Sequence, residues 1–238
     1  VYTSSLVVHS DTGGRRVDES FRFAGDHLSE YHRTKWQAHY EVAIPMMEAG
    51  LPLVVVQPGL VYGPGDHSAV ACMFEMFLRG RLPAVPGRAK HSWAHVDDIA
   101  DAHIAALERG RPGECYHLAG PDHSFRDVFR AAARITGRRP PPFEIPPVLM
   151  KALVPIAAAA ERFTGLPEPF RAESLRVSAG TTYISSSNKA EREFGFDPRP
   201  IEIGLRDTLA DIARRISGAE AFIGRRFDRR AVRSHRQN

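Results

Sequence analysis

The sequence predicts an α/β fold, a doubly wound parallel sheet with a small, mostly helical C-terminal region. Residues 53–56 are continuously apolar, which is typical of a parallel strand buried on both faces. A helical run over about residues 28–48 precedes them, with side chains recurring at three- and four-residue spacings. A short β segment, residues 1–8, comes before the helix and is interrupted by Ser4 and Ser5. In an open α/β sheet, ligands bind beyond the carboxyl ends of the strands, so the functional site is expected there.

Caps and helix breakers locate the other elements. The first helix is expected over residues 29–49, with Asp26 or Ser29 as its N-cap and Gly50 after its end. Asp97 is expected to cap a helix over residues 99–108. Further helices are expected at residues 68–79, 125–136, 189–194 and 203–216, a strand at 115–118, and an apolar helical stretch with proline interruptions at 146–164.

The composition is that of an ordinary globular protein, with 238 residues, 43% of them hydrophobic and 25% charged. Cys72 and Cys115 lie far apart without metal-ligand spacing, which predicts a reducing compartment and a cytoplasmic protein. The longest apolar stretch, residues 148–160, is too short to span a membrane, so no membrane association is expected. Residues 219–238 form an arginine-rich tail, interpreted as a solvated terminus rather than a nucleic-acid site.

Tyr31 and Lys35 form a Tyr-x-x-x-Lys pair inside the first predicted helix. Positions i and i+4 share one helix face, so the phenol and the ammonium can point into the same cleft. A tyrosine in water has a pKa of about 10, and a neighbouring cation stabilises its phenolate. The spacing therefore permits this pair to exchange a proton with a substrate near neutral pH.

Several ordered segments carry a resemblance to a known family. Ser5 lies 26 residues before Tyr31, and the buried strand is followed by Pro-Gly-Leu-Val-Tyr-Gly at residues 58–63. Later segments read Trp-Ala-His-Val-Asp-Asp-Ile-Ala at 93–100, Tyr-His-Leu-Ala-Gly at 116–120 and Phe-Gly-Phe-Asp-Pro at 194–198. In these segments the chain, over residues 1–212, resembles the extended short-chain dehydrogenase/reductase family. That family includes NAD(P)-dependent epimerases, dehydratases, and 3β-hydroxysteroid or dihydroflavonol-type reductases.

The resemblance implies a Rossmann-like fold that binds NAD or NADP, and a Ser-Tyr-Lys site. Tyr31 would exchange the hydroxyl proton, Lys35 would stabilise the phenolate and hold the nicotinamide ribose, and Ser5 would hydrogen-bond the developing alkoxide. Ser4 is the alternative to Ser5. The resemblance also assigns a turn to the nicotinamide, although a purely structural turn stays open; this turn consists of Pro58, Gly59, Leu60 and Val61.

The family's glycine-rich strand, turn and helix, which cradles the cofactor pyrophosphate, has no counterpart in the sequence. The chain is therefore expected to be the C-terminal two thirds of a longer protein. Residues 1–63 would complete the dinucleotide-binding domain, residues 64–218 would form a substrate-binding region interleaved with its last elements, and residues 219–238 the basic tail. Two interpretations stay open: an NAD(P)-dependent oxidoreductase or epimerase, and a non-catalytic truncated member that does not bind the cofactor.

The expected substrate is a small molecule, either an apolar ketone or a nucleotide sugar. The apolar residues 146–160 favour the ketone, whereas Arg88 and Lys90 could hold a diphosphate or lie in a solvated loop. His95 and His103 are interpreted as packing or hydrogen-bonding residues, because no metal-ligand spacing surrounds them. The family commonly dimerises through the helix that carries Tyr31, so a homodimer is expected.

Overall fold

The structure, a computed structural model, describes residues 1–234, with side chains described up to residue 218. Its strands are β1 (Tyr2–Thr3), β2 (Val55–Pro58), β3 (Leu60–Tyr62), β4 (Ala84–Pro86), β5 (Lys90–His95), β6 (Cys115–Leu118), β7 (Asp122–Ser124), β8 (Phe143–Ile145) and β9 (Thr182–Tyr183). Its helices are α1 (Glu30–Gln37), α2 (Ile44–Glu48), α3 (Ala69–Leu78), α4 (Val96–Arg109), α5 (Phe125–Thr136), α6 (Pro147–Ala160), α7 (Ala172–Ser178), α8 (Asn188–Phe194) and α9 (Ile201–Ser234). Two 3₁₀ turns, η1 (Leu6–His9) and η3 (Glu168–Phe170), and a π-helical segment, η2 (Ala38–Ala43), complete them.

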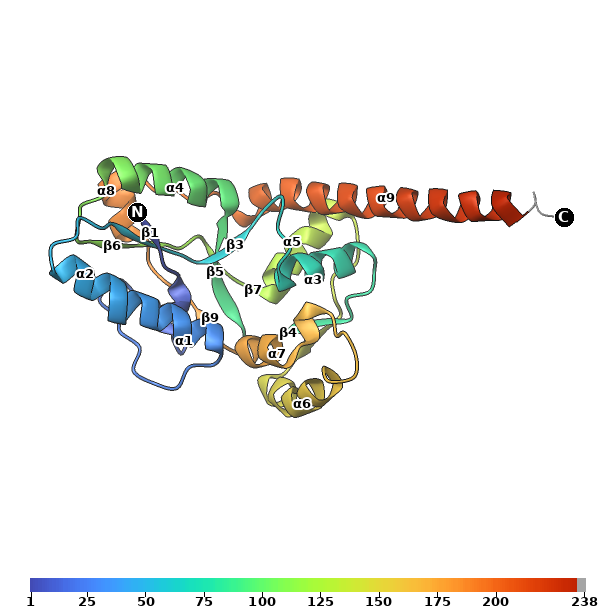
Figure 1. The fold of residues 1–238 in the computed structure, drawn as a ribbon, viewed down its shortest axis with the longest axis horizontal. Coiled ribbons are helices and arrows are strands. Elements are labelled where there is room, and N and C mark those ends of the chain that lie inside the picture. Colours follow the sequence, from blue (N-terminus) through green and yellow to red (C-terminus); the bar gives the residue numbers. More distant parts are fainter. Residues whose placement is uncertain (235–238) are drawn as a thin grey trace.

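The first sheet is parallel and has helices on both faces. Its strand order is β1-β2-β6, with Thr3 opposite Val56 and Val56 opposite Tyr116. Helices α4 and α8 cover one face, and α1 and α2 lie on the other (Figure 1). Residues 53–56 are apolar because the strand they lead into is enclosed on both sides, and Val55 to Pro58 are all buried. The predicted α/β fold with a parallel sheet is confirmed.

The chain leaves this sheet through Gly59 and enters a second one. There β3 and β9 run parallel to β5, and β7 runs antiparallel to it. A side chain at Gly59 would place its Cβ 2.4 Å from the Ser92 carbonyl oxygen, and one at Gly120 would place it 1.7 Å from that of Trp93. Only glycine therefore allows β5 to cross the ends of β2 and β6.

Three clusters of buried side chains hold the elements together. The first joins α3, α5 and α9 around Trp93, and the second packs α4 and α8 against β2 and β6. The third is smaller and joins α6 to α7 through Met150, Ala157 and Leu175. Strands β4 and β8 pair beside these helices, so the C-terminal region is mostly helical, as predicted.

Several predicted elements agree with the structure. Strand β6 and helix α5 have the predicted bounds, since Ser124 and Asp127 form a capping box and Gly137 ends the helix in a left-handed conformation. The helix that carries Tyr31 is capped by Ser29, whose hydroxyl accepts the His32 backbone N–H, and it continues through η2 into α2. Pro155 lies inside α6 without ending it.

Two local predictions are wrong. Residues 6–8 are not a strand, because the Ser5 hydroxyl accepts the Val7 backbone N–H and starts the 3₁₀ turn η1. Asp97 does not cap α4; the helix begins at Val96, and the His95 ring accepts the Asp97 backbone N–H instead. Asp97 therefore lies in the first helical turn, where a carboxylate still interacts favourably with the helix dipole.

Helix α9 continues to Ser234, through most of the segment predicted to be a basic tail, and residues 235–238 lie outside the described part of the chain. Within residues 1–234, no helix has both the length and the apolar character needed to cross a bilayer. Cys72 and Cys115 are free thiols, both half-buried. The predicted division at residues 63 and 218 and the cytoplasmic location stay predictions.

Buried histidines are a feature of this fold that the sequence did not indicate. Burial lowers the pKa of four histidines from 6.5 to about 4; these are His9, His32, His39 and His91. Burial also lowers the pKa of His117 well below 6.5. Between about pH 4 and 6.5 the unfolded chain therefore binds more protons than the folded chain. Their contribution to stability is complete above about pH 6.5 and is lost as the pH falls through this window.

We expect His91→Phe to make the protein less sensitive to acid. The His91 ring stacks on Tyr183, and its Nδ1 has no hydrogen-bond partner among the described residues, so phenylalanine preserves the packing and removes the proton uptake. The fall in unfolding free energy between pH 7 and 5 should shrink by on the order of 1–2 kcal/mol. Urea unfolding at both pH values measures this, with the exposed His67→Gln as control. An unchanged pH dependence in His91→Phe would show that His91 is protonated in the folded state.

Candidate functional site

Lys35 reaches the carboxyl end of β1. Its Nζ donates a hydrogen bond of 3.4 Å to the carbonyl oxygen of Thr3, the last residue of that strand. Tyr31 lies one turn earlier on α1, with 51% of its surface exposed. The structure therefore brings the Tyr-Lys helix to the strand end that the two serines follow.

Buried hydrogen-bonding side chains hold the first turn of α1 against β9. The Ser29 hydroxyl and His32 Nδ1 are 2.6 Å apart, and His32 Nε2 lies 3.0 Å from the hydroxyl of Tyr183 on β9. Ser29, His32 and Tyr183 are all buried. Because His32 is fixed on both ring nitrogens, the neighbouring Tyr31 backbone is held in place while its phenol stays accessible.

The two candidate serines have different surroundings. Ser5 is half-buried, and its hydroxyl oxygen accepts the Val7 N–H at 3.4 Å, which leaves the hydroxyl hydrogen available to a substrate oxygen. Ser4 is buried, and its Oγ has no hydrogen-bond partner among the described residues. A buried hydroxyl without a partner is unusual and indicates a group that could receive one from a ligand.

The Pro58–Val61 segment is divided between two sheets. Pro58 is two residues beyond Val56, the partner of Thr3, so the parallel register places it level with Ser5. Gly59 is in an extended link, not a turn, and its lack of a side chain serves the contact with Ser92. Leu60 and Val61 belong to β3 and pack against two different cores. Of these residues, Pro58 and Gly59 lie at the edge that Ser5 and Lys35 share.

A buried polar network lies beside this edge. Gln57 Nε2 is 3.3 Å from His9 Nε2, which is 2.9 Å from His117 Nε2, and His117 Nδ1 contacts the Ser185 hydroxyl. Burial lowers the pKa of His9 and His117, so the network is neutral at pH 7. In the sequence, the network could have been anticipated from Gln57 and His117, because each is a polar side chain inside an apolar strand.

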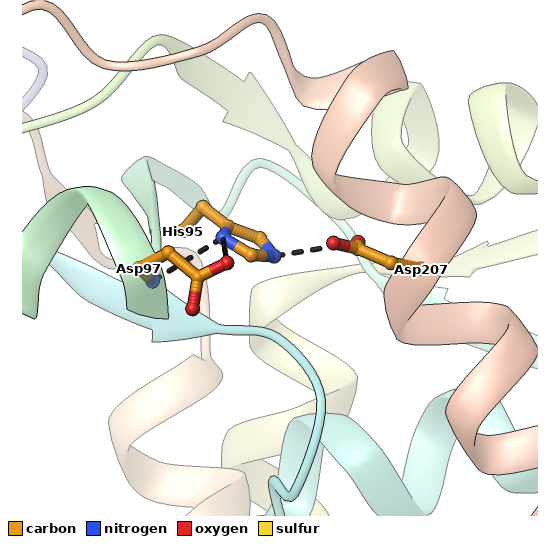
Figure 2. Close-up of side chains that lie close together, drawn as sticks. All are labelled: His95, Asp97 and Asp207. Atoms are coloured by element: carbon orange, nitrogen blue, oxygen red, sulfur yellow. Dashed lines mark hydrogen bonds and ion pairs between the residues drawn. The ribbon is translucent and has the colours of Figure 1, made fainter.

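A second cluster joins residues far apart in the sequence. His95 is buried, with Nδ1 3.5 Å from the carboxylate of Asp97 and Nε2 3.4 Å from that of Asp207 on α9 (Figure 2). One ligand atom from each of the three lies within 4.8 Å of the others, which is close enough to suggest a cation site. Sequence reasoning missed it because Asp207 follows His95 by more than a hundred residues.

Arg199 already supplies the positive charge at this cluster. Its guanidinium lies 3.7 Å from Asp97, 4.0 Å from Asp207 and 2.7 Å from Asp98. The two His95 nitrogens also face different carboxylates. The cluster fastens the start of α4 to α9. His103 bonds to Thr3 and Ile99, the hydrogen-bonding role predicted for it.

Comparison with known proteins gives the family. Residues 1–119 match the NAD dependent epimerase/dehydratase family. The 2-alkyl-3-oxoalkanoate reductase of Stenotrophomonas maltophilia is 30% identical over 229 residues, which cover 90% of this chain and 68% of the relative. Sterol demethylase protein B of Methylococcus capsulatus is 27% identical over 187 residues, covering 76% of this chain and 56% of the relative.

The solved structure of gox2253 has 29% sequence identity and a TM-score of 0.74, and the match covers 90% of this chain and 66% of that one. The chain thus spans between about half and two thirds of the proteins it matches. These matches agree with the parallel sheet, and the chain belongs to the NAD dependent epimerase/dehydratase family, whose cofactor class is the one predicted from the sequence.

Proposed function

We propose that this chain carries the reaction centre of an NAD(P)-dependent oxidoreductase acting on a secondary alcohol or ketone. The observation that supports this most is the hydrogen bond from Lys35 Nζ to the Thr3 carbonyl, because it fixes the ammonium one residue before the serine pair. The reductase from Stenotrophomonas maltophilia, the relative at 30% identity, supports ketone reduction over sugar epimerisation.

The residues present fit one half of a nicotinamide dinucleotide. Lys35 and Tyr31 would hold the nicotinamide ribose, and Pro58 and Gly59 lie at the edge where the ring would rest. A glycine-rich loop opening a helix, which would hold the pyrophosphate, is not found in residues 1–234. The cofactor, when bound, gives or accepts the hydride.

The proton chemistry belongs to the chain's own side chains. The Tyr31 hydroxyl would give its proton to the substrate oxygen during reduction and take it back during oxidation. The Lys35 ammonium would stabilise the phenolate in between, and the Ser5 hydroxyl would donate a hydrogen bond to the developing alkoxide. His9 and His117, in the buried network beside this edge, are neutral at pH 7. They therefore add no positive charge to that of Lys35.

Replacement of Tyr31 by phenylalanine should remove the proton donor and leave the packing unchanged, since the phenol is exposed. We expect kcat of the full-length protein for ketone reduction to fall by about 10²–10⁴-fold. NADH binding, followed by fluorescence titration, should weaken far less than kcat falls, because Lys35 would still hold the nicotinamide ribose. Tyr40→Phe removes a hydroxyl from the same helix, where it donates to the Phe21 carbonyl, and should leave kcat unchanged.

Normal turnover in Tyr31→Phe would refute the proposed role. The same titration addresses the second candidate, a non-catalytic member, which is favoured by the lack of a glycine-rich loop in residues 1–234. If the full-length wild type bound neither NADH nor NADPH, the non-catalytic function would be the correct one.

Ser5 and Ser4 can be separated by single substitutions. We expect Ser5→Ala to lower kcat about 10²-fold, because it removes a donor aimed at the developing alkoxide. Ser4→Ala should change kcat less than threefold and is the matched control, with circular dichroism as a check on folding. The reverse result would assign the role to Ser4, whose buried hydroxyl would then find its partner in the substrate.

We also propose a homodimer that uses the second half of the Tyr31 helix. Val42 and Met46 are one turn apart there and are 53% and 47% exposed, so they form a small apolar surface that an interface could cover. Ile104, on the helix covering the opposite face of the sheet, is 57% exposed and gives a matched comparison.

Sedimentation equilibrium should show a dimer for the wild type and a monomer for Met46→Glu, since an interface cannot bury an unpaired carboxylate cheaply. Ile104→Glu should remain dimeric. A dimer in Met46→Glu together with a monomer in Ile104→Glu would place the interface on α4 instead.

A further inference from the structure

An apolar cavity of about 350 Å³ lies between α3, α6 and α7. Met73 and Phe125 line it from one core cluster, and Met150 and Leu175 line it from another. Ser174 and Ser178 are the polar residues of this lining. Among the side chains described, no lysine, arginine, histidine or carboxylate faces this cavity.

The size and chemistry of this cavity indicate an apolar occupant. The cavity is partly open to solvent, and its volume of about 350 Å³ lies within the range of small-molecule sites. Ordered water needs two to four polar partners, which two serine hydroxyls in an otherwise apolar lining do not supply. A hydrocarbon group can pack against this lining without burying a polar atom that lacks a hydrogen-bond partner.

Diphosphate recognition finds no support here. The basic residues that the sequence offered for it, Arg88 and Lys90, are exposed, and neither lines the cavity. Lys90 begins β5 and pairs there with Ser124 and Thr182. A nucleotide sugar in this cavity would bury two negative charges without a cation, at a high desolvation cost.

Contacting rings connect the cavity to Tyr31. Phe125 lines the cavity and meets the His91 ring at 5.3 Å, and His91 stacks on Tyr183 at 5.2 Å. Tyr183 lies 5.6 Å from His32, whose ring is 6.1 Å from that of Tyr31. The cavity and the first turn of α1 therefore pack against opposite ends of one series of buried rings.

The ring series is uncharged at neutral pH. Burial lowers the pKa of His91 and His32 to about 4 and raises the pKa of Tyr183. The rings between the cavity and Tyr31 thus carry no charge that would attract an anion.

We propose that this cavity binds the uncharged hydrocarbon part of the substrate, so that the chain acts on an alkyl or alicyclic ketone or alcohol. The reaction itself rests on the proposed oxidoreductase function, whereas the ligand class rests on the cavity lining. The two can fail separately, because the cavity can be tested without cofactor or turnover.

The test is binding of N-phenyl-1-naphthylamine, an uncharged apolar fluorophore, to the 238-residue chain. We expect a saturable fluorescence increase at one site, displaced by 2-dodecanone and unaffected by UDP-glucose. Ala157→Leu fills the cavity from α6 and should weaken the fluorophore at least tenfold. Ala158→Leu adds the same bulk to an exposed neighbour outside the lining and should leave affinity unchanged.

Equal affinity in the two leucine variants, or displacement by UDP-glucose, would overturn the proposal. If circular dichroism shows that Ala157→Leu is unfolded, Ala160→Leu, which also narrows the cavity, takes its place. Tyr31→Phe should bind the fluorophore normally. If the fluorophore binds and Tyr31→Phe keeps full turnover, the proposed reaction is rejected and the proposed ligand site is retained. If the fluorophore does not bind and Tyr31→Phe loses turnover, only the proposed ligand site is rejected.

Discussion

The close approach of the β5 backbone to Gly59 and Gly120 is the constraint on which the rest of the structure depends. A Cβ atom at either glycine would overlap a carbonyl oxygen of β5, so no other residue fits without moving a strand. This crossing fixes where β2 and β6 end and sends the chain into the second sheet. The edge that holds Ser5 and Lys35 is consequently bordered by backbone on one side and open at Tyr31 on the other.

Burial determines the charge at this edge. The histidines beside it are held neutral by desolvation, and their contacts with each other, Gln57 and Ser185 add no charge. Lys35 is half-buried, so its ammonium acts through a medium that screens it less than water does.

Local signals in the sequence predicted local structure well. Ser124, Asp127 and Gly137 define the two ends of α5, and the apolar run at residues 53–56 predicted the parallel sheet. Asp97 failed as a cap because His95, a less common capping residue, takes the position. The Asp97–Asp207 cluster, the histidine network and the cavity depend on contacts between residues tens to hundreds of positions apart. No spacing rule reports such contacts, and only the fold reveals them.

Polarity differs between the two ends of the series of rings from Tyr31 to Phe125, and this difference limits the orientation that the proposed substrate could take. At the β1 end, the ammonium of Lys35 and the serine hydroxyls can donate hydrogen bonds to an oxygen, whereas the cavity beyond Phe125 is almost entirely apolar. A ketone bound in reverse would bury its carbonyl away from donors, which costs roughly 1–3 kcal/mol, and would expose its hydrocarbon at the polar edge. For the proposed substrate, both penalties would favour the orientation with the oxygen toward Tyr31. Orientation at this site therefore requires no specific attraction within the cavity, because the mismatch of the reversed pose is sufficient.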